Sequence, residues 1–186
     1  MSEAIQIRGG FDRATADRLR AGDAVSFSGV VYTARDAAHK RICEMLDRGE
    51  ASPIPLEDAV IYYAGPAPAR PGRPTGPVGP TTSYRMDPYA PRLLDLGVRA
   101  MIGKGARSQE VTDAIVRNHG VYLAAVGGAA ALIAQCVRSV EVVCFEDLGA
   151  EAVRRLEVER MPLTVVIDAQ GDNLYEQGPA RYLASR

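Results

Sequence analysis

The sequence predicts an α/β fold whose mixed sheet is built from βαβ units. Short apolar runs of strand composition alternate with segments whose apolar residues recur at helical spacing, most regularly after residue 98. This alternation is typical of parallel strands joined by crossover helices. Near the end of the chain, a run over 163–168 and a polar turn before 174–175 indicate a closing hairpin instead.

The composition is that of an ordinary globular chain, expected to form a single domain over 1–186. Of its 186 residues 47% are apolar and 24% are charged, and the net charge is −1. A chain this close to neutral offers no electrostatic footprint for nucleic acid or for an anionic membrane surface. No apolar run reaches the roughly 18 residues of a membrane-spanning helix.

The three cysteines are expected to be buried structural thiols rather than metal ligands. Their odd number, without a visible secretory signal, argues for the reducing cytoplasm. Three thiolates could in principle hold an iron–sulfur cluster with one open iron. However, Cys43 falls on the apolar side of an expected helix, and Cys144 falls in an apolar strand. Neither they nor Cys136 form a C-x-x-C pair, so we expect no metal site on this chain.

The first half of the chain is expected to begin with a strand–strand–helix–strand order. Strands are expected at 5–8, 24–32 and 59–64. Thr33 is expected to cap a helix that ends near 48–49, with Asp36 completing a weak capping box. The apolar face of this helix comprises Ala38, Ile42, Met45 and Leu46.

A Pro- and Gly-rich loop over 65–80 follows the third strand. A loop this long inside a domain is usually functional or disordered, and a flexible tether is the alternative to a functional role. Beyond it, Pro88 suits the first turn of a helix. That helix is expected to bury Leu93, Leu94 and Leu96.

The second half of the chain alternates more regularly. Ser108 is expected to cap a helix that ends at 118–120, and Gly127 with Gly128 opens an Ala-rich helix. Strands are expected at 98–102, 121–126 and 139–144, with a polar turn at Glu146 and Asp147.

Polar clusters follow four of the expected strands at the end where ligands bind. In open α/β sheets, ligands bind beyond the carboxyl ends of the strands. The groups that follow strands 24–32, 59–64, 98–102 and 121–126 are, in that order, Arg35, the segment 79–87, Lys104, and Gly127 with Gly128. This coincidence predicts one shared site.

Arg35 and Arg85 are the candidate clamp for a small dicarboxylate. Arg35 would lie in the first turn of its helix, where the helix dipole disfavours a cation unless an anion is bound. Each of two guanidiniums can grip a carboxylate through two hydrogen bonds. The alternatives are a solvated Arg35 paired with Asp36 or Glu3, and a loop salt bridge between Arg85 and Asp87.

Other residues near these strand ends are candidates for supporting roles. Lys104 lies between two glycines, where its ammonium could pair with an anion, although a surface turn is the alternative. Gly127 and Gly128 could offer backbone N–H groups to an anion, or could serve tight packing of strand on helix. The residues expected to support the site without touching the ligand are Asp36, His39, which faces away from the apolar stripe, Asp87, Gly127 and Gly128.

Thr81 and Thr82 supply the candidate proton-transfer group. A hydroxyl is a poor base unless a neighbour lowers its pKa or takes its proton. Lys104 or Arg85 nearby could stabilise a developing alkoxide. A capping or backbone hydrogen bond is the alternative for either threonine.

These same residues resemble the β subunit, or C-terminal domain, of the iron–sulfur hydro-lyases, which include class I fumarases and L(+)-tartrate dehydratase. Several motifs match in order over most of the chain, which makes the resemblance specific to the family but not to one substrate. The matching segments are 22–23, 32–39, 79–87, 102–105, 127–132 and 146–149.

The resemblance implies a swivelling β/β/α domain that docks on a larger α subunit in an α₂β₂ assembly. In that family the α subunit carries a [4Fe-4S] cluster whose open iron polarises the substrate's hydroxyl and a carboxylate. The cluster's ligands find no counterpart in this chain. Thr81 would be the base, assisted by Lys104. The residues implied to hold the dicarboxylate are Arg35, Thr82, Arg85 and Lys104.

The leading hypothesis is the β subunit of a [4Fe-4S]-dependent hydro-lyase that reversibly hydrates a C4 dicarboxylate, with fumarate and malate expected first. An L(+)-tartrate dehydratase β subunit is the alternative, since the substrates differ by one hydroxyl. A non-catalytic module that binds a carboxylate and regulates a partner is the alternative of another class. Thr81 and Lys104 argue against it, because a pure binder needs only the arginines.

Overall fold

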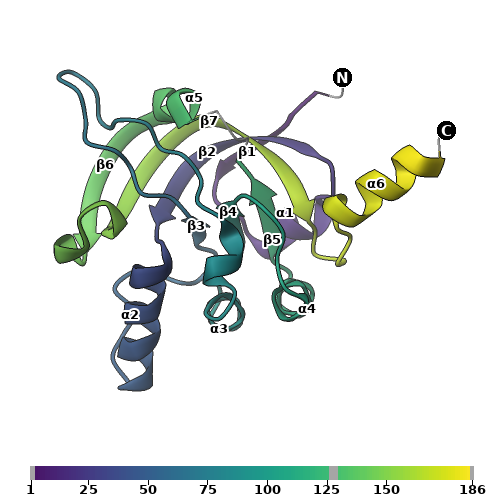
Figure 1. Ribbon diagram of the computed structural model, residues 1–186, viewed down its shortest axis with the longest axis horizontal. Coiled ribbons are helices and arrows are strands. Elements are labelled where there is room, and N and C mark those ends of the chain that lie inside the picture. Colours follow the sequence, from purple (N-terminus) through teal and green to yellow (C-terminus); the bar gives the residue numbers. More distant parts are fainter. Residues whose placement is uncertain (1–2, 126–129, 185–186) are drawn as a thin grey trace.

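The computed structural model describes residues 3–125 and 130–184. Figure 1 shows a strongly curved sheet with helices packed beneath it. The strands are β1 (Ile5–Gly9), β2 (Ala24–Thr33), β3 (Val60–Tyr62), β4 (Ala100–Gly103), β5 (Val121–Ala124), β6 (Val137–Cys144) and β7 (Val153–Ile167). The helices are α1 (Arg13–Arg18), α2 (Asp36–Asp47), α3 (Ala90–Asp95), α4 (Gln109–Arg117), α5 (Ala130–Cys136) and α6 (Leu174–Ala184), with 3₁₀ helices η1 (Ser83–Met86) and η2 (Glu146–Glu151).

Five of the strands close into a barrel. β2, β3, β4 and β5 are neighbours in that order and run parallel. β7 pairs antiparallel with both β5 and β2, which closes the ring. β1 extends the sheet parallel to β2, and β6 extends it antiparallel to β7. The predicted α/β class and mixed sheet are confirmed, whereas the closure was not predicted.

β7 closes the barrel because it is long enough to reach both edges. Its 15 residues pair with β2 along most of their length and with β5 at their end. Near the middle, Arg160 adopts a left-handed backbone (φ 53°), and the pairing with β2 shifts register opposite Ser28. The Arg160 N–H donates to the Ser28 hydroxyl at 2.9 Å. Such a bulge bends a strand, and a bent strand can follow the barrel wall.

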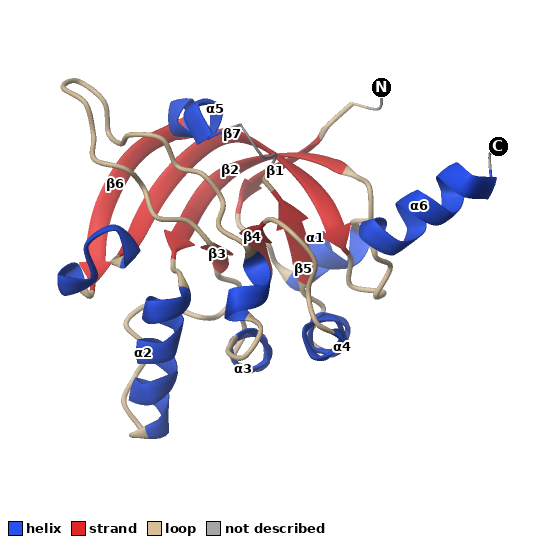
Figure 2. Cartoon of the chain, in the orientation of Figure 1, coloured by secondary structure: helices blue, strands red, loops and turns tan. Residues whose placement is uncertain are grey.

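Alternation along the strands divides the apolar side chains between two cores. Because successive side chains point to opposite faces, one set fills the barrel and the other packs under the helices. The first core includes Val31, Val60, Tyr62, Ala100, Ile102, Leu123, Leu156 and Val165. The second includes Ile61, Met101, Tyr122, Val166 and the inward faces of α2, α3 and α4. Figure 2 shows these three helices on one side of the sheet.

The helix after β2 begins later than predicted, and Thr33 does not cap it. Thr33 is the last residue of β2, and its hydroxyl accepts the Arg154 N–H at 3.2 Å. Arg35 is the N-cap residue instead, without a side-chain cap bond. The Thr33 hydroxyl, predicted to cap the helix, therefore bonds to β7 instead.

The hairpin predicted after residue 168 is reduced to a turn with one isolated antiparallel bridge, between Ile167 and Asn173, and a helix takes the place of its second strand. The buried Asp168 accepts the Gln170 and Asp172 N–H groups at 3.0 Å, which makes a tight polar turn. The Asn173 side chain then accepts the Tyr175 N–H at 3.1 Å, and α6 begins at Leu174. The polar residues of this turn thus start a helix, and the antiparallel partner of the sheet is β7.

Other element predictions were closer to the structure. Ser108 caps α4 by accepting the Val111 N–H, and His119 beyond its end has a φ of 52°. Leu96, expected in the core, is 44% exposed because α3 ends at Asp95.

Every helix in the described part of the chain is too short or too polar for a membrane span.

Candidate active site

The carboxyl ends of four parallel strands meet at one edge of the barrel. Thr33 of β2 lies beside Tyr62 of β3, and Gly103 of β4 lies beside Ala124 of β5. Register pairs Tyr62 with Ile102, so all four ends are level. The segments that carry Arg35, Thr81 to Arg85 and Lys104 start from this edge, as predicted. The predicted contribution of Gly127 and Gly128 lies outside the described residues.

The segment 79–87 is fastened across the ends of β3 and β4 by its backbone. The Thr81 N–H donates to the Tyr63 carbonyl at 2.7 Å, and the Ser83 N–H donates to the Lys104 carbonyl at 2.9 Å. Thr82 and Lys104 form a parallel bridge. Thr82, a candidate for proton transfer, and Lys104, a candidate for anion binding, therefore lie on adjacent backbone segments.

Ser83, which the sequence did not single out, locks this arrangement. Its hydroxyl lies 2.8 Å from the Tyr122 hydroxyl and accepts the Lys104 N–H at 3.0 Å. Tyr122 in turn donates to the Gly105 carbonyl at 2.9 Å, and burial raises the pKa of Tyr122. A Cβ at Gly103 would overlap the Ser83 hydroxyl, so the glycine allows the close approach.

The side chains of Thr81, Thr82 and Lys104 are open to a ligand. Both threonines are partly exposed and Lys104 is exposed. Thr82 is the N-cap residue of η1 but makes no side-chain cap bond, so the capping alternative is not observed for it. Lys104 makes no ion pair with any residue that the structure describes.

Two arginines and two carboxylates alternate in a row at the start of α2. Glu151 Oε1 lies 3.0 Å from Arg35 Nη2, Arg35 Nε lies 4.0 Å from Asp36 Oδ1, and Asp36 Oδ2 accepts from Arg85 Nη2 at 2.7 Å. Both arginines therefore pair with Asp36, and the pairing of Arg35 with Asp36 that sequence left as an alternative is present. The pairing of Arg85 with Asp87 that sequence left open is absent from the described contacts.

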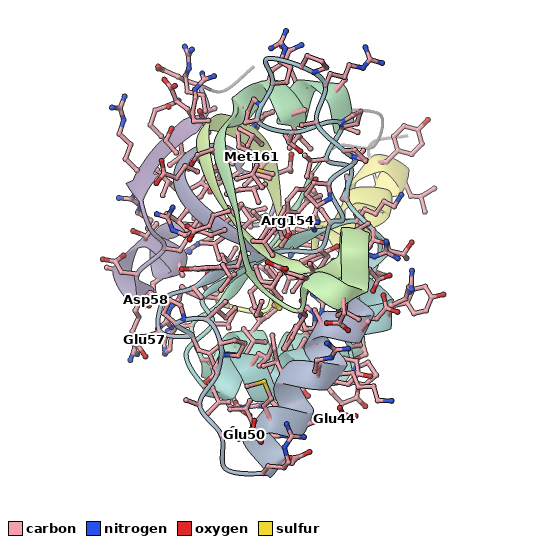
Figure 3. All side chains as sticks on the ribbon, turned by 90° about the vertical axis from the view of Figure 1, so that its left-hand side faces the viewer. Glu44, Glu50, Glu57, Asp58, Arg154 and Met161 are labelled. Atoms are coloured by element: carbon pink, nitrogen blue, oxygen red, sulfur yellow. The ribbon has the colours of Figure 1, made fainter. Side chains whose placement is uncertain are left out.

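Glu151 was missed by sequence reasoning. Figure 3 shows the 146–151 segment against the upper end of α2, opposite the end near Glu44 and Glu50. The only signal was the matching segment 146–149 beside it, which carried no assigned role. Contact between the segment and α2 depends on the fold, so the ion pair could not be read from spacing.

A buried ion pair anchors the far end of the 79–87 segment. Asp87 Oδ1 accepts from Arg107 Nε at 2.7 Å, and Oδ2 accepts the Ser108 N–H at 2.7 Å. The Arg107 side chain is fully buried, with its guanidinium over the rings of Tyr63 and Tyr122. Asp87 thus holds the segment to the loop before α4. Sequence reasoning missed Arg107, which no pattern distinguished from a surface arginine.

His39 lies in the core, contrary to the prediction that it faces away from the apolar stripe. It is 1% exposed, and its ring meets the Tyr63 ring edge-on. Nδ1 lies 2.8 Å from the Arg35 carbonyl, which makes Nδ1 the donor. Burial lowers the pKa of His39 to about 4. The buried face of α2 is broader than the apolar stripe because tyrosines from neighbouring elements cover it.

The cysteines lie apart on three elements. Cys43 is on α2, Cys136 ends α5 and Cys144 ends β6. Burial raises the pKa of each thiol, which disfavours the thiolate that binds metal. Within residues 3–125 and 130–184, no three His, Cys, Asp or Glu side chains gather as a metal site needs. The described residues therefore do not fit an iron–sulfur cluster.

Most of the chain is similar in sequence to known proteins. A family model described as "Fumarase C-terminus" matches residues 2–178. The aerobic class I fumarate hydratase of Salmonella typhimurium is 41% identical over 155 residues, 82% of this chain and 27% of that protein. Fumarate hydratase 1 of Leishmania major, described as mitochondrial, is 43% identical over 159 residues, 82% of this chain and 28% of that protein.

A shorter relative is matched over nearly its whole length. A putative L(+)-tartrate dehydratase subunit beta of Methanocaldococcus jannaschii is 40% identical over 166 residues, 86% of this chain and 85% of that protein. The chain therefore spans little more than a quarter of the fumarate hydratases and most of a separate subunit.

Proposed function

The chain belongs to the fumarase C-terminal family, and we propose that it is the β subunit of a [4Fe-4S]-dependent hydro-lyase acting on a C4 dicarboxylate, fumarate and malate first. The single observation that supports the proposal is that the segments carrying Arg35, Thr81 to Arg85 and Lys104 start from one edge of the barrel. Three cations and a hydroxyl suit a substrate with two carboxylates and a proton to lose.

In this proposal the dicarboxylate is held by four side chains, those of Arg35, Arg85, Lys104 and Thr82. Arg35 and Arg85 each pair with Asp36, and a guanidinium can grip a carboxylate through two hydrogen bonds. Lys104 adds a point charge from the next strand end, and Thr82 adds a hydroxyl beside it. Because Asp36 and Glu151 offset the two guanidiniums, Lys104 supplies the excess positive charge that draws a dianion.

Thr81 is the proposed base and Lys104 its assistant. Removal of a proton next to a carboxylate builds negative charge on that carboxylate, which the arginines stabilise more in the transition state than in the ground state. Thr81 acts only if its alkoxide is stabilised, and the ammonium of Lys104 is on the backbone segment paired with Thr82. Asp36, His39 and Asp87 support these groups through the contacts of Arg85, Arg35 and Arg107.

The cluster is proposed to come from a separate α subunit, in an α₂β₂ assembly. When bound, such a cluster supplies a Lewis acid for the leaving hydroxyl. The relative described as a subunit beta supports a partner chain. The whole chain, 1–186, would act as one swivelling β/β/α domain on that partner, and its three free thiols suit the reducing cytoplasm.

Reconstitution tests the proposal. The chain is mixed with its α partner under anaerobic conditions, and hydration of fumarate and dehydration of L(+)-tartrate are measured. We expect fumarate turnover only from the mixture. Full activity from this chain alone, without iron, would overturn the assignment, and turnover of tartrate in preference to fumarate would move it to the tartrate dehydratase that the Methanocaldococcus jannaschii relative suggests.

A Thr81→Ala variant separates the enzyme from a carboxylate-binding regulatory module. In the enzyme, kcat should fall by at least about 100-fold while substrate affinity changes little. Thr15→Ala on α1, where the Thr15 N–H donates to the cap residue Asp12, serves as a control and should keep the wild-type kcat. Unchanged turnover in Thr81→Ala would remove Thr81 as the base.

A further inference from the structure

We infer that Glu151 is a positioning residue that sets the orientation of the Arg35 guanidinium toward the dicarboxylate. The inference rests on the proposed function, which gives Arg35 a carboxylate to hold. Glu151 Oε1 lies 3.0 Å from Arg35 Nη2, and both side chains are about three-quarters buried, with 23% and 25% exposed. An ion pair at this depth restrains both partners far more than a surface pair would.

The second oxygen of Glu151 binds the start of α2. Oε2 accepts the Ala37 N–H at 3.4 Å, one of the backbone donors that a helix leaves unpaired in its first turn. One carboxylate thus joins the guanidinium and the helix that carries it. A negative charge at this end of a helix is also favoured by the helix dipole.

Glu151 itself is held by its own segment. Arg154 donates to the carbonyls of Gly149 at 2.8 Å and of Ala150 and Ala152 at 3.2 Å. These carbonyls flank Glu151 in the chain. The carboxylate is therefore presented from a fixed backbone, as a positioning group requires.

The stem of Arg35 also packs near Gly65. A Cβ at Gly65 would lie 3.4 Å from Arg35 Cδ and 2.8 Å from the Ala150 carbonyl oxygen. Asp36 limits the guanidinium from the direction of Arg85. Arg35 Nε is buried without a hydrogen-bond partner among the described residues, and it lies 4.0 Å from Asp36 Oδ1. Because Glu151 binds Nη2, it sets the direction in which the rest of the Arg35 guanidinium points.

A double-mutant cycle tests the inference in the complex with the α partner. Glu151→Ala is expected to lower kcat/KM by about 10- to 100-fold, because a misplaced guanidinium loses its alignment with the substrate. Arg35→Ala should cost at least as much. If Glu151 acts through Arg35, then Arg35→Ala with Glu151→Ala should match Arg35→Ala within about twofold. Multiplicative losses would overturn the inference.

Two further variants separate positioning from general structure. Glu151→Gln keeps an oxygen for Arg35 and should retain more activity than Glu151→Ala. Asp147→Asn is the matched control, since it weakens an exposed pair with Arg41 that joins the same two elements. It should keep kcat/KM within about threefold. A loss in Asp147→Asn equal to that in Glu151→Ala would assign the effect to docking of the segment.

A readout independent of turnover comes from ¹⁵N NMR of the full chain. The Arg35 Nε–H is expected to give a distinct, slowly exchanging signal that Asp147→Asn keeps and Glu151→Ala loses. Retention of that signal in Glu151→Ala would overturn the inference. If the signal is lost but Arg35→Ala remains fully active, the proposed function fails and the positioning contact stands. If Arg35→Ala is inactive and Glu151→Ala is not, the inference fails and the function stands.

Discussion

At the scale of single residues, the site is organised by carboxylates that hold its cations in place. Glu151 pairs with Arg35, Asp36 with Arg85, and Asp87 with Arg107. The first two pairs are partly open and the third is almost closed to solvent. The carboxylates therefore orient the arginine side chains, and replacing a carboxylate should displace the arginine that it binds.

Asp87→Asn should lower the free energy of unfolding by about 3 kcal/mol, because it leaves the buried Arg107 without a counter-charge. Asp95→Asn is the control, since its pair with Arg117 is half exposed and should contribute less than about 1 kcal/mol. Urea unfolding of both variants measures the two losses. Equal small losses would mean that Arg107 finds another partner.

The pH dependence of stability should contain a contribution from His39. Its pKa is about 4 in the folded chain against 6.5 in the unfolded chain, so between these values the unfolded chain binds more protons. The free energy of unfolding should therefore fall as pH drops from 6.5 to 4, by up to about 3 kcal/mol. Melting temperatures of wild type and His39→Asn over this range check it; curves that stay parallel would contradict it.

At the scale of elements, the segment 79–87 behaves as a strap across strand ends. Its backbone bonds to the ends of β3 and β4, Ser83 fills the space beside Gly103, and Asp87 ties its end to the loop before α4. These three attachments hold Thr81 and Arg85 in place on a segment whose regular structure is the short 3₁₀ helix η1. Its position depends on small residues under it.

Gly103→Ala should loosen this strap. The new methyl group overlaps the Ser83 hydroxyl, and overpacking of this kind costs about 1–3 kcal/mol. Gly178→Ala in α6 is the control, because nothing lies within 4 Å of its added Cβ. That change should be neutral or should stabilise by up to about 1 kcal/mol. Thermal unfolding compares the two, and similar melting temperatures would show that the strap yields freely.

At the scale of the whole molecule, the barrel sets where the site is and how rigid it is. The parallel pairing of β2 to β5 places their four carboxyl ends on one rim, and β7 closes the barrel by pairing with both β5 and β2. The long loop over 65–80 is joined to the barrel by Tyr62, whose buried hydroxyl donates to the Val78 carbonyl at 2.7 Å. A packed interior thus supports a rim that carries the polar groups.

Leu123→Ala should test this interior. Leu123 is fully buried in the barrel core, and removal of such a side chain costs about 2–5 kcal/mol. Leu132→Ala on α5, where the side chain is half exposed, should change the stability by less than about 1 kcal/mol. Urea unfolding followed by circular dichroism measures both. Equal effects would show that the barrel interior is loosely packed.

The sequence by itself determined the local elements, the family and the rim on which the polar groups gather. Helix caps such as Ser108, strand composition and the order of motifs are carried by neighbouring residues, and parallel strands put their carboxyl ends together by necessity. The tertiary structure alone decided the barrel closure, the helix after Asn173, the burial of His39 and the pairs of Arg35 with Glu151 and Asp87 with Arg107. These depend on contacts between segments far apart in the chain, and no short-range pattern of apolar and polar residues encodes which distant partner a side chain meets.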